Sequence, residues 1–303
     1  INNNSYEVQI YREDYTGETT ELTGATSCFV VSGTDEDFMY HPVRTSSATL
    51  SVLDSDLMID LYSINNQYAS VKLLKNGSLE WTGYIKPEQY TQPYSSSTQN
   101  IGVECVCALS TLEYIEYKQM SVLGSVTMWQ LLKHLINNTK GGYKGVYIPN
   151  VYVDSSGIIG NVLDDITLIE NNFTNGGMNC LDVLEAVCKF LNWAVHDIGG
   201  YLYFVDIDWK GEYHLYDETL SEYTSVTGKE ILIQDVGYNG SDVNRLDVVH
   251  GYNKASVKAL NNVFDEIITN EDYDTLEAYN NEYLVMTYKH SGEPYANRRK
   301  FLK

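Results

Sequence analysis

The clearest hydrophobic pattern in the chain lies at residues 180–208. Its first part spaces apolar residues as one face of a helix does, with Asn179 in the N-cap position and Asp182 three residues later, a variant of the capping box. Gly199 and Gly200 then supply a turn that tolerates positive φ, so the second part predicts a tight β-hairpin. The apolar positions of the predicted helix are Leu181, Leu184, Val187, Cys188 and Leu191.

The second strand of this hairpin, residues 201–207, is apolar on both faces. Leu202 and Phe204 alternate onto one face. Tyr203 and Val205 alternate onto the other. Such a strand is central to its domain, and a single helix covers only one of its faces. We therefore expect another part of the chain, or another subunit, to cover the second face.

A second helix is predicted at residues 127–136, and Gly141 with Gly142 closes it. Residues 143–178 are interrupted by glycine and proline and predict loops rather than a long element. The apolar stripe of the helix consists of Met128, Leu131, Leu132, Leu135 and Ile136.

The first hundred residues alternate apolar and polar positions in short runs with turn signals between them. Asn76-Gly77 separates two of these runs and is a strong short-range signal of a hairpin. The pattern predicts a small barrel or sandwich. The predicted strands lie at residues 6–10, 27–32, 48–52, 68–74, 79–85 and 101–107, with further candidates at 230–236 and 245–257.

The chain is strongly acidic, since 41 Asp and Glu against 20 Lys and Arg give a net charge of −21. A nucleic-acid site needs clustered basic residues, and residues 298–300 form the only basic cluster, which we interpret as a solvated tail. The charge also argues against binding to an anionic membrane surface. No run of about 20 apolar residues predicts a membrane-spanning helix, and no signal peptide is visible.

Tyrosine is unusually frequent, with 26 Tyr against 7 Phe. Its apolar ring and polar hydroxyl suit surfaces that become half-buried in interfaces. Tyrosine also fills strands well. The sequence leaves both interpretations open.

The five cysteines do not form a disulfide framework. Cys105 and Cys107 lie two residues apart on a predicted strand. Cys180 and Cys188 lie about 12 Å apart along a helix, which is too far to bridge, and Cys28 is left over. No Cys-His spacing suits zinc. We expect buried, reduced thiols in a protein made in a cytoplasm.

The common catalytic motifs are missing from the sequence: it has no P-loop, no G-x-S-x-G elbow, no H-E-x-x-H and no G-x-G-x-x-G. No histidine pairs with another at ligand spacing, so we interpret each as a surface or turn residue. We predict no catalytic, cofactor-binding or metal-binding residues. The six histidines are His41, His134, His196, His214, His250 and His290.

Asp206 and Asp208 form the best carboxylate pair. At strand spacing they face the same side, about 7 Å apart, which suits a metal ion or a general acid with its base. The alternative interpretation is that they mark the polar end of a strand.

Two other acidic groups are weaker candidates. Asp54, Asp56 and Asp60 match a calcium loop only loosely, because no Gly stands at its sixth position and no Glu at its twelfth. Asp164-Asp165 is interpreted as an ordinary loop pair.

Four short segments accompany the helix and hairpin described first, at residues 11–18, 41–48, 81–88 and 90–94. Together they resemble tail proteins of bacteriophages and prophages of gut Bacteroidetes. The broader similarity is to the baseplate hub family of contractile and siphophage tails, which is related to the spike-carrying protein of type VI secretion. The resemblance runs over most of residues 6–255.

The resemblance implies a mostly β, α+β chain with two tube-like β-barrel domains, each with a flanking helix. Residues 1–118 would be the first domain, 119–178 a connecting segment with a helix, and 179–258 the second domain. Residues 259–303 would be an acidic segment at which a further domain could begin.

The resemblance also implies a homotrimeric ring, without enzyme activity or cofactor, that caps a tail tube and links it to a spike or fibre. Its partners would be the tube, the distal tail protein and the spike or fibre, and DNA would pass without specific binding. Such a chain is assembled in the bacterial cytoplasm, enters the virion and does not insert into a membrane. We expect acidic side chains along the lumen of the ring, where they would repel the DNA backbone.

The alternative function is a glycan-binding module or a carbohydrate-active enzyme that uses Asp206 and Asp208. Exposed aromatic rings could stack on sugars. A cleft lined by aromatic rings and convergent carboxylates would favour this alternative, whereas a wide, flat self-association surface would favour the hub.

Overall fold

The computed structural model of the chain describes residues 4–33, 41–54, 61–87, 97–150, 162–174, 177–206 and 209–227, and four two-residue strands beyond them. The chain divides into two compact units, Ile1–Glu230 and Ile231–Lys303. In the second unit, the parallel pair is β15 (Ala255–Ser256) with β16 (Leu284–Val285), and the antiparallel pair is β17 (Lys289–His290) with β18 (Glu293–Pro294). The strand candidate at residues 230–236, nearly all of that at 245–257, and the basic cluster at 298–300 lie outside the described residues.

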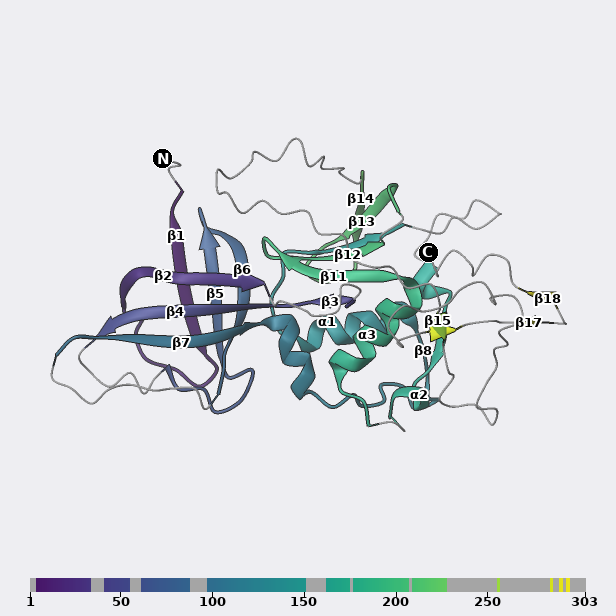
Figure 1. Ribbon diagram of the computed structural model, residues 1–303, viewed down its shortest axis with the longest axis horizontal. Helices are drawn as coiled ribbons and strands as arrows, with labels where there is room; N and C mark the ends of the chain where they lie inside the picture. Colours follow the sequence, from purple (N-terminus) through teal and green to yellow (C-terminus); the bar gives the residue numbers. More distant parts are fainter. Residues whose placement is uncertain are drawn as a thin grey trace. The chain divides into compact units, whose positions relative to one another are not determined.

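The first unit begins with a six-stranded, antiparallel sheet in the order β1-β5-β6-β7-β4-β2. The sheet curls around its apolar face (Figure 1). β1 and β2 are its two edges and do not pair with each other, so the sheet is an open half-barrel. The strands are β1 (Tyr6–Arg12), β2 (Thr23–Gly33), β4 (Ser46–Asp54), β5 (Ala69–Lys75), β6 (Ser78–Ile85) and β7 (Gln99–Cys107).

The hairpin predicted at Asn76-Gly77 is confirmed. Both residues have positive φ, 51° and 78°, and they join β5 to β6. Two left-handed residues in sequence give the turn that matches the right-handed twist of its strands. The interior of the half-barrel is apolar, and Phe29 of β2 packs edge-on against Trp81 of β6 with ring centroids 5.4 Å apart.

The second six-stranded sheet is mixed, in the order β14-β13-β9-β12-β11-β3. β12 runs parallel to β9, and β11 runs parallel to β3. β3 comes from the N-terminal part of the chain, between two strands of the first sheet, so the two sheets are interleaved in sequence. The proposed domain boundaries stay a prediction. The strands are β3 (Val43–Arg44), β9 (Val146–Pro149), β11 (Trp193–Ile198), β12 (Tyr201–Asp206), β13 (Glu212–Tyr216) and β14 (Tyr223–Thr227).

Both predicted helices are confirmed, and so is the predicted N-cap at Asn179. The predicted closure of the other helix at Gly141-Gly142 is wrong, because that helix ends at Asn138 with Thr139 as its C-cap. In α3 (Cys180–Leu191), the Asn179 side chain accepts from the backbone N–H of Asp182, and the helix ends at Asn192 with a φ of 60°. In α1 (Met128–Asn138), Thr127 and Gln130 form a reciprocal capping box. The smaller elements are β8 (Ser125–Thr127), which pairs with β10 (Thr167–Ile169), and the short helices η2 (Ala108–Tyr114), η3 (Val162–Asp164) and α2 (Asn171–Thr174).

The helices explain the unequal burial of the hairpin's two faces. α1 and α3 lie along one face of the second sheet (Figure 1), and Leu202 and Phe204 of β12 are fully buried. Tyr201, Tyr203 and Val205, which alternate with them, are only half-buried. Helices therefore cover one side of this strand, as the sequence predicts, whereas its second side, which we also expected to be covered, is only half-buried.

The cysteines of the described chain are all free thiols. Four of them are buried in the apolar core, and Cys28 on β2 is exposed. Burial raises the pKa of Cys105 to about 12. No helix in the part of the chain that the structure describes is long and apolar enough to cross a bilayer.

Candidate assembly surface

Asp206 does not lie in an open cleft. It is the last residue of β12, only 8% exposed, and it alternates onto the same face as the buried Leu202 and Phe204. Burial raises the pKa of the Tyr213 hydroxyl most, and the negative charge of the nearby Asp206 raises it further. Asp208 lies outside the described residues, so the geometry of the carboxylate pair stays a prediction.

The other acidic candidates do not form a metal site in the described chain. Asp54 ends β4, and residues 55–60 lie outside the described part. Asp164 ends η3, and burial raises its pKa. Among the residues that the structure describes, no group of three or more His, Cys, Asp or Glu side chains is placed to hold a metal ion.

Among the histidines, His41 contacts a carboxylate and a backbone carbonyl. Its Nε2 lies 3.1 Å from Oε1 of Glu185 on α3, and its Nδ1 lies 2.9 Å from the carbonyl oxygen of Val43. These contacts tie the segment before β3 to α3. His134 and His196 are partly buried and His214 is fully buried, and burial lowers the pKa of each. The interpretation as a surface or turn residue is therefore wrong for His214, which lies within β13. His250 lies outside the described residues, and only the backbone of His290 is described.

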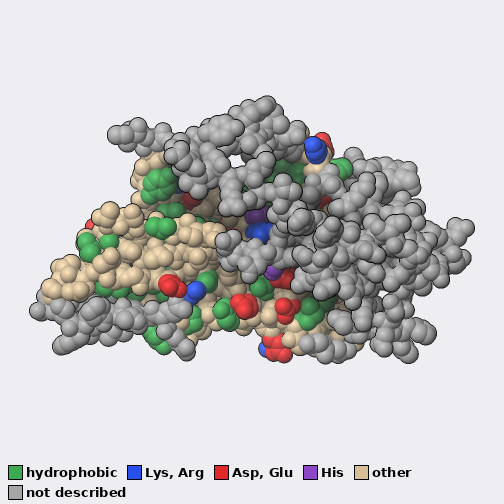
Figure 2. Space-filling view, viewed as in Figure 1, with side chains coloured by type: hydrophobic (Ala, Val, Ile, Leu, Met, Phe, Trp, Pro, Cys, Tyr) green, Lys and Arg blue, Asp and Glu red, His purple; other side chains and the backbone are tan. Residues whose placement is uncertain are grey.

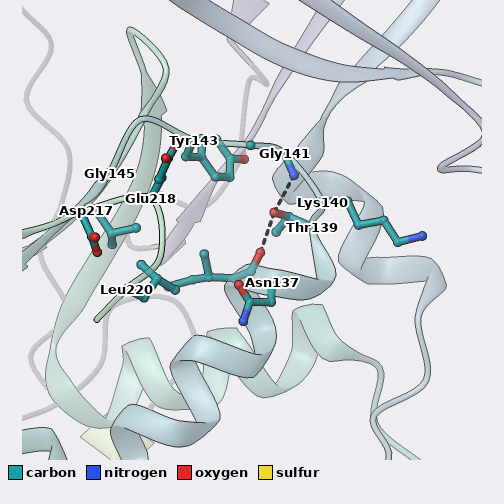
Figure 3. A pocket seen from close by; sticks show the side chains of 12 residues that line it. Asn137, Thr139, Lys140, Gly141, Tyr143, Gly145, Asp217, Glu218 and Leu220 are labelled. Atoms are coloured by element: carbon teal, nitrogen blue, oxygen red, sulfur yellow. Dashed lines mark hydrogen bonds between the residues drawn. The ribbon is translucent and has the colours of Figure 1, made fainter. Parts of the chain in front are cut away.

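A small cavity lies between the loop after α1 and the turn between β13 and β14 (Figure 3). Its volume is about 110 Å³, well below the roughly 300 Å³ at which ligand pockets begin. Its carboxylate Asp217 is already engaged, because it accepts from the Thr219 hydroxyl at 2.7 Å and from the Ser221 N–H at 3.1 Å. Lys140 points away from the cavity in Figure 3. The cavity therefore offers no convergent set of free polar groups.

The two sheets present four edges, and two of them are protected. β1 carries Glu7 and Arg12, and Arg12 donates to the hydroxyl of Tyr68 at 2.9 Å and to Asp14 at 3.3 Å. Charged residues on an edge discourage pairing with another strand. β3 is protected in another way, because it is only two residues long.

The other two edges carry no charge. β2 has eleven residues without a charged side chain or a proline. Its pairing with β4 is irregular between Gly24 and Phe29 and regular from there on, and Val30 and Val31 on its two faces are 47% and 42% exposed. β14 has five residues without a charged side chain or a proline. A long, uncharged, exposed edge is a template for another strand.

The surface over the first sheet agrees with this description. In the view of Figure 2, the described surface over β2 and β4 is mainly neutral and hydrophobic, although the chain as a whole carries a charge of −21. Like charges pressed together oppose association. A surface of this kind is therefore the part of an acidic chain best suited to contact another copy.

The face of the second sheet opposite α1 and α3 is aromatic and half-buried. Tyr147 on β9 and Tyr203 on β12 stack with their ring centroids 4.4 Å apart and 7° between their planes. Tyr201 packs edge-on against Tyr147 at 5.5 Å, and Nζ of Lys144 lies 4.5 Å from the centroid of the Tyr201 ring. One face each of Tyr147 and Tyr203 is therefore covered by the other ring, and Lys144 lies over the ring of Tyr201, which leaves less ring surface on which a sugar could stack.

The sequence analysis missed the two uncharged edges. It identified residues 27–32 as a strand but not as an edge, and it gave residues 223–227 no assignment. The available signal was the absence of charge over residues 23–33 and 223–227 in a chain with 20% charged residues.

No protein-family model matches the chain, and no curated protein matches it. Among the solved structures that are similar to it are three described as tail proteins. The one from Neisseria meningitidis MC58 shares 14% identity over 66% of this chain and 50% of its own length, with a TM-score of 0.37. The 43 kDa tail protein of prophage MuSo2 from Shewanella oneidensis shares 15% identity over 66% of this chain and 53% of its own length, with a TM-score of 0.40.

The third similar structure is a prophage tail protein from Listeria monocytogenes EGD-e. It shares 15% identity over 67% of this chain and 52% of its own length, with a TM-score of 0.39. The chain thus spans about half the length of each of the three structures.

Proposed function

We propose that this chain is a structural component of a bacteriophage or prophage tail. In the proposed role it is a baseplate hub or tail-tip protein, and three copies form a ring that caps the tail tube and links it to a spike or fibre. The observation that carries the proposal is the presence of two open, six-stranded sheets in one chain. Three copies would supply six sheets of two different topologies, three antiparallel and three mixed, so the proposed ring has three-fold symmetry and its two kinds of sheet are not equivalent.

Sequence features support the same role. Two of the sequence segments that resemble tail proteins form strands: residues 41–48 include β3, and residues 81–88 include most of β6. The similar solved structures are described as proteins of the same class. The proposed partners are the tube, the distal tail protein and the spike or fibre.

The acidity fits a ring through which DNA passes. Basic side chains would hold the phosphate backbone by releasing its counterions, whereas acidic side chains repel it over roughly 8 Å at physiological salt. We propose that part of the charge of −21 lines the lumen. A net basic lumen in a reconstructed ring would contradict this part of the proposal.

The glycan alternative lacks a comparable observation. Asp206 alternates onto the buried face of β12, and Tyr147 and Tyr203 each cover one face of the other ring. We therefore do not advance it as a second function.

Immunogold labelling of purified tail particles tests the proposed role. An antibody raised against this chain should label one end of the tails of a phage or prophage that encodes it. Tails without label would contradict the proposal. So would turnover of a glycan by the purified chain that is lost in Asp206→Ala.

A further inference from the structure

The four sheet edges differ in a way that restricts how two copies can meet. β1 is protected by charge and β3 by its length, whereas β2 and β14 have neither form of protection. The two unprotected edges belong to different sheets, one to each. The chain therefore carries two different pairing surfaces rather than one.

The two unprotected edges also match each other in length and regularity. Residues 29–33 of β2 pair one to one with residues 46–50 of β4. Residues 223–227 of β14 pair one to one with residues 212–216 of β13. Each edge thus offers a regular, unbulged segment of the same length. Regular segments are the ones on which a further strand can continue the ladder of hydrogen bonds.

We propose that the β2 edge of one copy pairs with the β14 edge of the next copy, so that backbone hydrogen bonds join the two sheets across the subunit boundary. This inference rests on the proposed ring and names the contact that closes it. A second copy is the fitting occupant, because one chain carries both halves of the contact. Pairing between two different surfaces of identical chains is heterologous, and it forms a closed ring when the rotation closes.

The absence of charge on both edges, and a comparison with two-fold pairing of β2, favour the same contact. Each chain carries a charge of −21, and neither edge adds a charged residue to the boundary. Pairing of β2 with β2 about a two-fold axis would leave β14 unprotected in the dimer. Head-to-tail pairing uses both edges.

Disulfide trapping tests this contact directly. Cys28 is the one exposed cysteine of the described chain, so Cys28→Ser provides a background in which the remaining native thiols are buried. Into it we would place Val30→Cys or Val31→Cys together with Thr224→Cys or Ser225→Cys. The four combinations sample both faces of each strand. Under mild oxidant we expect at least one combination to give covalent dimers and trimers on a non-reducing gel.

Two controls define the contact. Val30→Cys or Val31→Cys without a cysteine on β14 should give no covalent dimer, and a dimer would establish two-fold pairing of β2 and overturn the proposal. Gln9→Cys on the charged edge β1, combined with Ser225→Cys, should also remain uncross-linked. Cross-linking as strong as that from β2 would show that the edges do not discriminate.

A charge on the edge gives a second, independent measurement. Val30 is half exposed, so Val30→Lys should leave the circular dichroism spectrum almost unchanged. It should weaken self-association by roughly tenfold or more, because an edge lysine opposes strand addition. Gln9→Lys on β1 is the matched control and should have little effect. Equal effects of the two substitutions would overturn the proposal.

The outcomes separate this contact from the proposed function. Trimers without any β2–β14 cross-link would overturn the contact and leave the ring standing. A chain that stays monomeric in all variants would overturn both.

Discussion

The two sheets of the first unit bury their apolar faces by different means. The first sheet is wholly antiparallel and curls, so that its own strands cover its interior and Phe29 on β2 reaches Trp81 on β6. The second sheet is mixed and relies on α1 and α3 to cover one face, while its other face remains half-buried and aromatic. The strands of the first sheet all lie within residues 6–107, whereas those of the second are collected from residues 43–227.

This difference makes the contact between the sheets important for the second one. At the tip of the β11–β12 hairpin, the carbonyl oxygen of Gly200 accepts from the N–H of Lys144 at 2.9 Å. Nζ of Lys144 lies 3.1 Å from the hydroxyl of Ser78 on β6. A Cβ atom at Gly200 would approach the backbone of Leu79. We therefore expect changes at this tip to affect stability more than changes on isolated surface turns.

The largest effect is expected for Gly200→Ala. The φ of Gly200 is +77°, and a Cβ there would lie 2.5 Å from the carbonyl oxygen of Leu79, so backbone would have to move. Left-handed strain and overlap together should cost about 3 kcal/mol of unfolding free energy. Urea unfolding monitored by tryptophan fluorescence would measure it.

Gly199→Ala is the matched control. Gly199 also has positive φ, +59°, but no atom lies within 4 Å of the added Cβ. It should cost only the left-handed strain, about 1 kcal/mol. Equal losses in the two variants would contradict the close approach of the hairpin tip to β6.

The next largest effect concerns Asp197 on β11. Burial raises the pKa of its carboxyl to about 7, although the hydrogen bond from the Tyr143 hydroxyl at 3.3 Å lowers it in part. Its Oδ1 atom is buried without a hydrogen-bond partner. The folded state therefore binds the proton more tightly than the unfolded state, whose pKa is about 3.9. Stability should fall as the pH rises from about 4 to about 7.

Asp197→Asn removes this charge. A shift of about three pKa units corresponds to about 4 kcal/mol at most. Because the side chain is partly exposed, we expect a gain of about 2 kcal/mol at pH 8 and almost none at pH 4. Asp165→Asn on the exposed loop is the control. A gain that is independent of pH would contradict the assignment.

The smallest effect tests the helix that supports the second sheet. Asn179→Ala removes the side chain that caps α3, and it should cost about 1 kcal/mol. Asn179→Asp keeps an acceptor at the same position and should leave stability nearly unchanged. Thermal unfolding followed by circular dichroism would compare the two variants, and an equal loss in both would show that the cap does not stabilise α3.

Much of the local structure could be predicted because its signals are local. The cap at Asn179, the Asn76-Gly77 turn and the helical stripes each lie within a few residues, and all are confirmed. The capping box of Thr127 and Gln130 has an equally local signal, which the sequence analysis missed. The order of the second sheet could not be predicted in this way. β3 is only two residues long and β9 ends in Pro149, so neither has a pattern of its own, and each is fixed by pairing with β11, β12 or β13.

The candidate surface was only partly predictable for a related reason. Alternation shows that residues 27–32 form a strand, but edge position is a property of the whole sheet. Asp206 shows the converse problem, because its spacing from Asp208 suggested chemistry, whereas its alternation with Leu202 and Phe204 places it on a buried face. The face of the sheet on which Asp206 lies, rather than its spacing from Asp208, determines what Asp206 can contact.

Native mass spectrometry of the purified chain tests the central claim most directly. The account predicts a closed assembly with three times the 34.3 kDa mass of one chain, and this species should persist on dilution while Val30→Lys shifts it toward monomers. A chain that stays monomeric at every concentration, or that stops at a two-fold dimer, would contradict the ring.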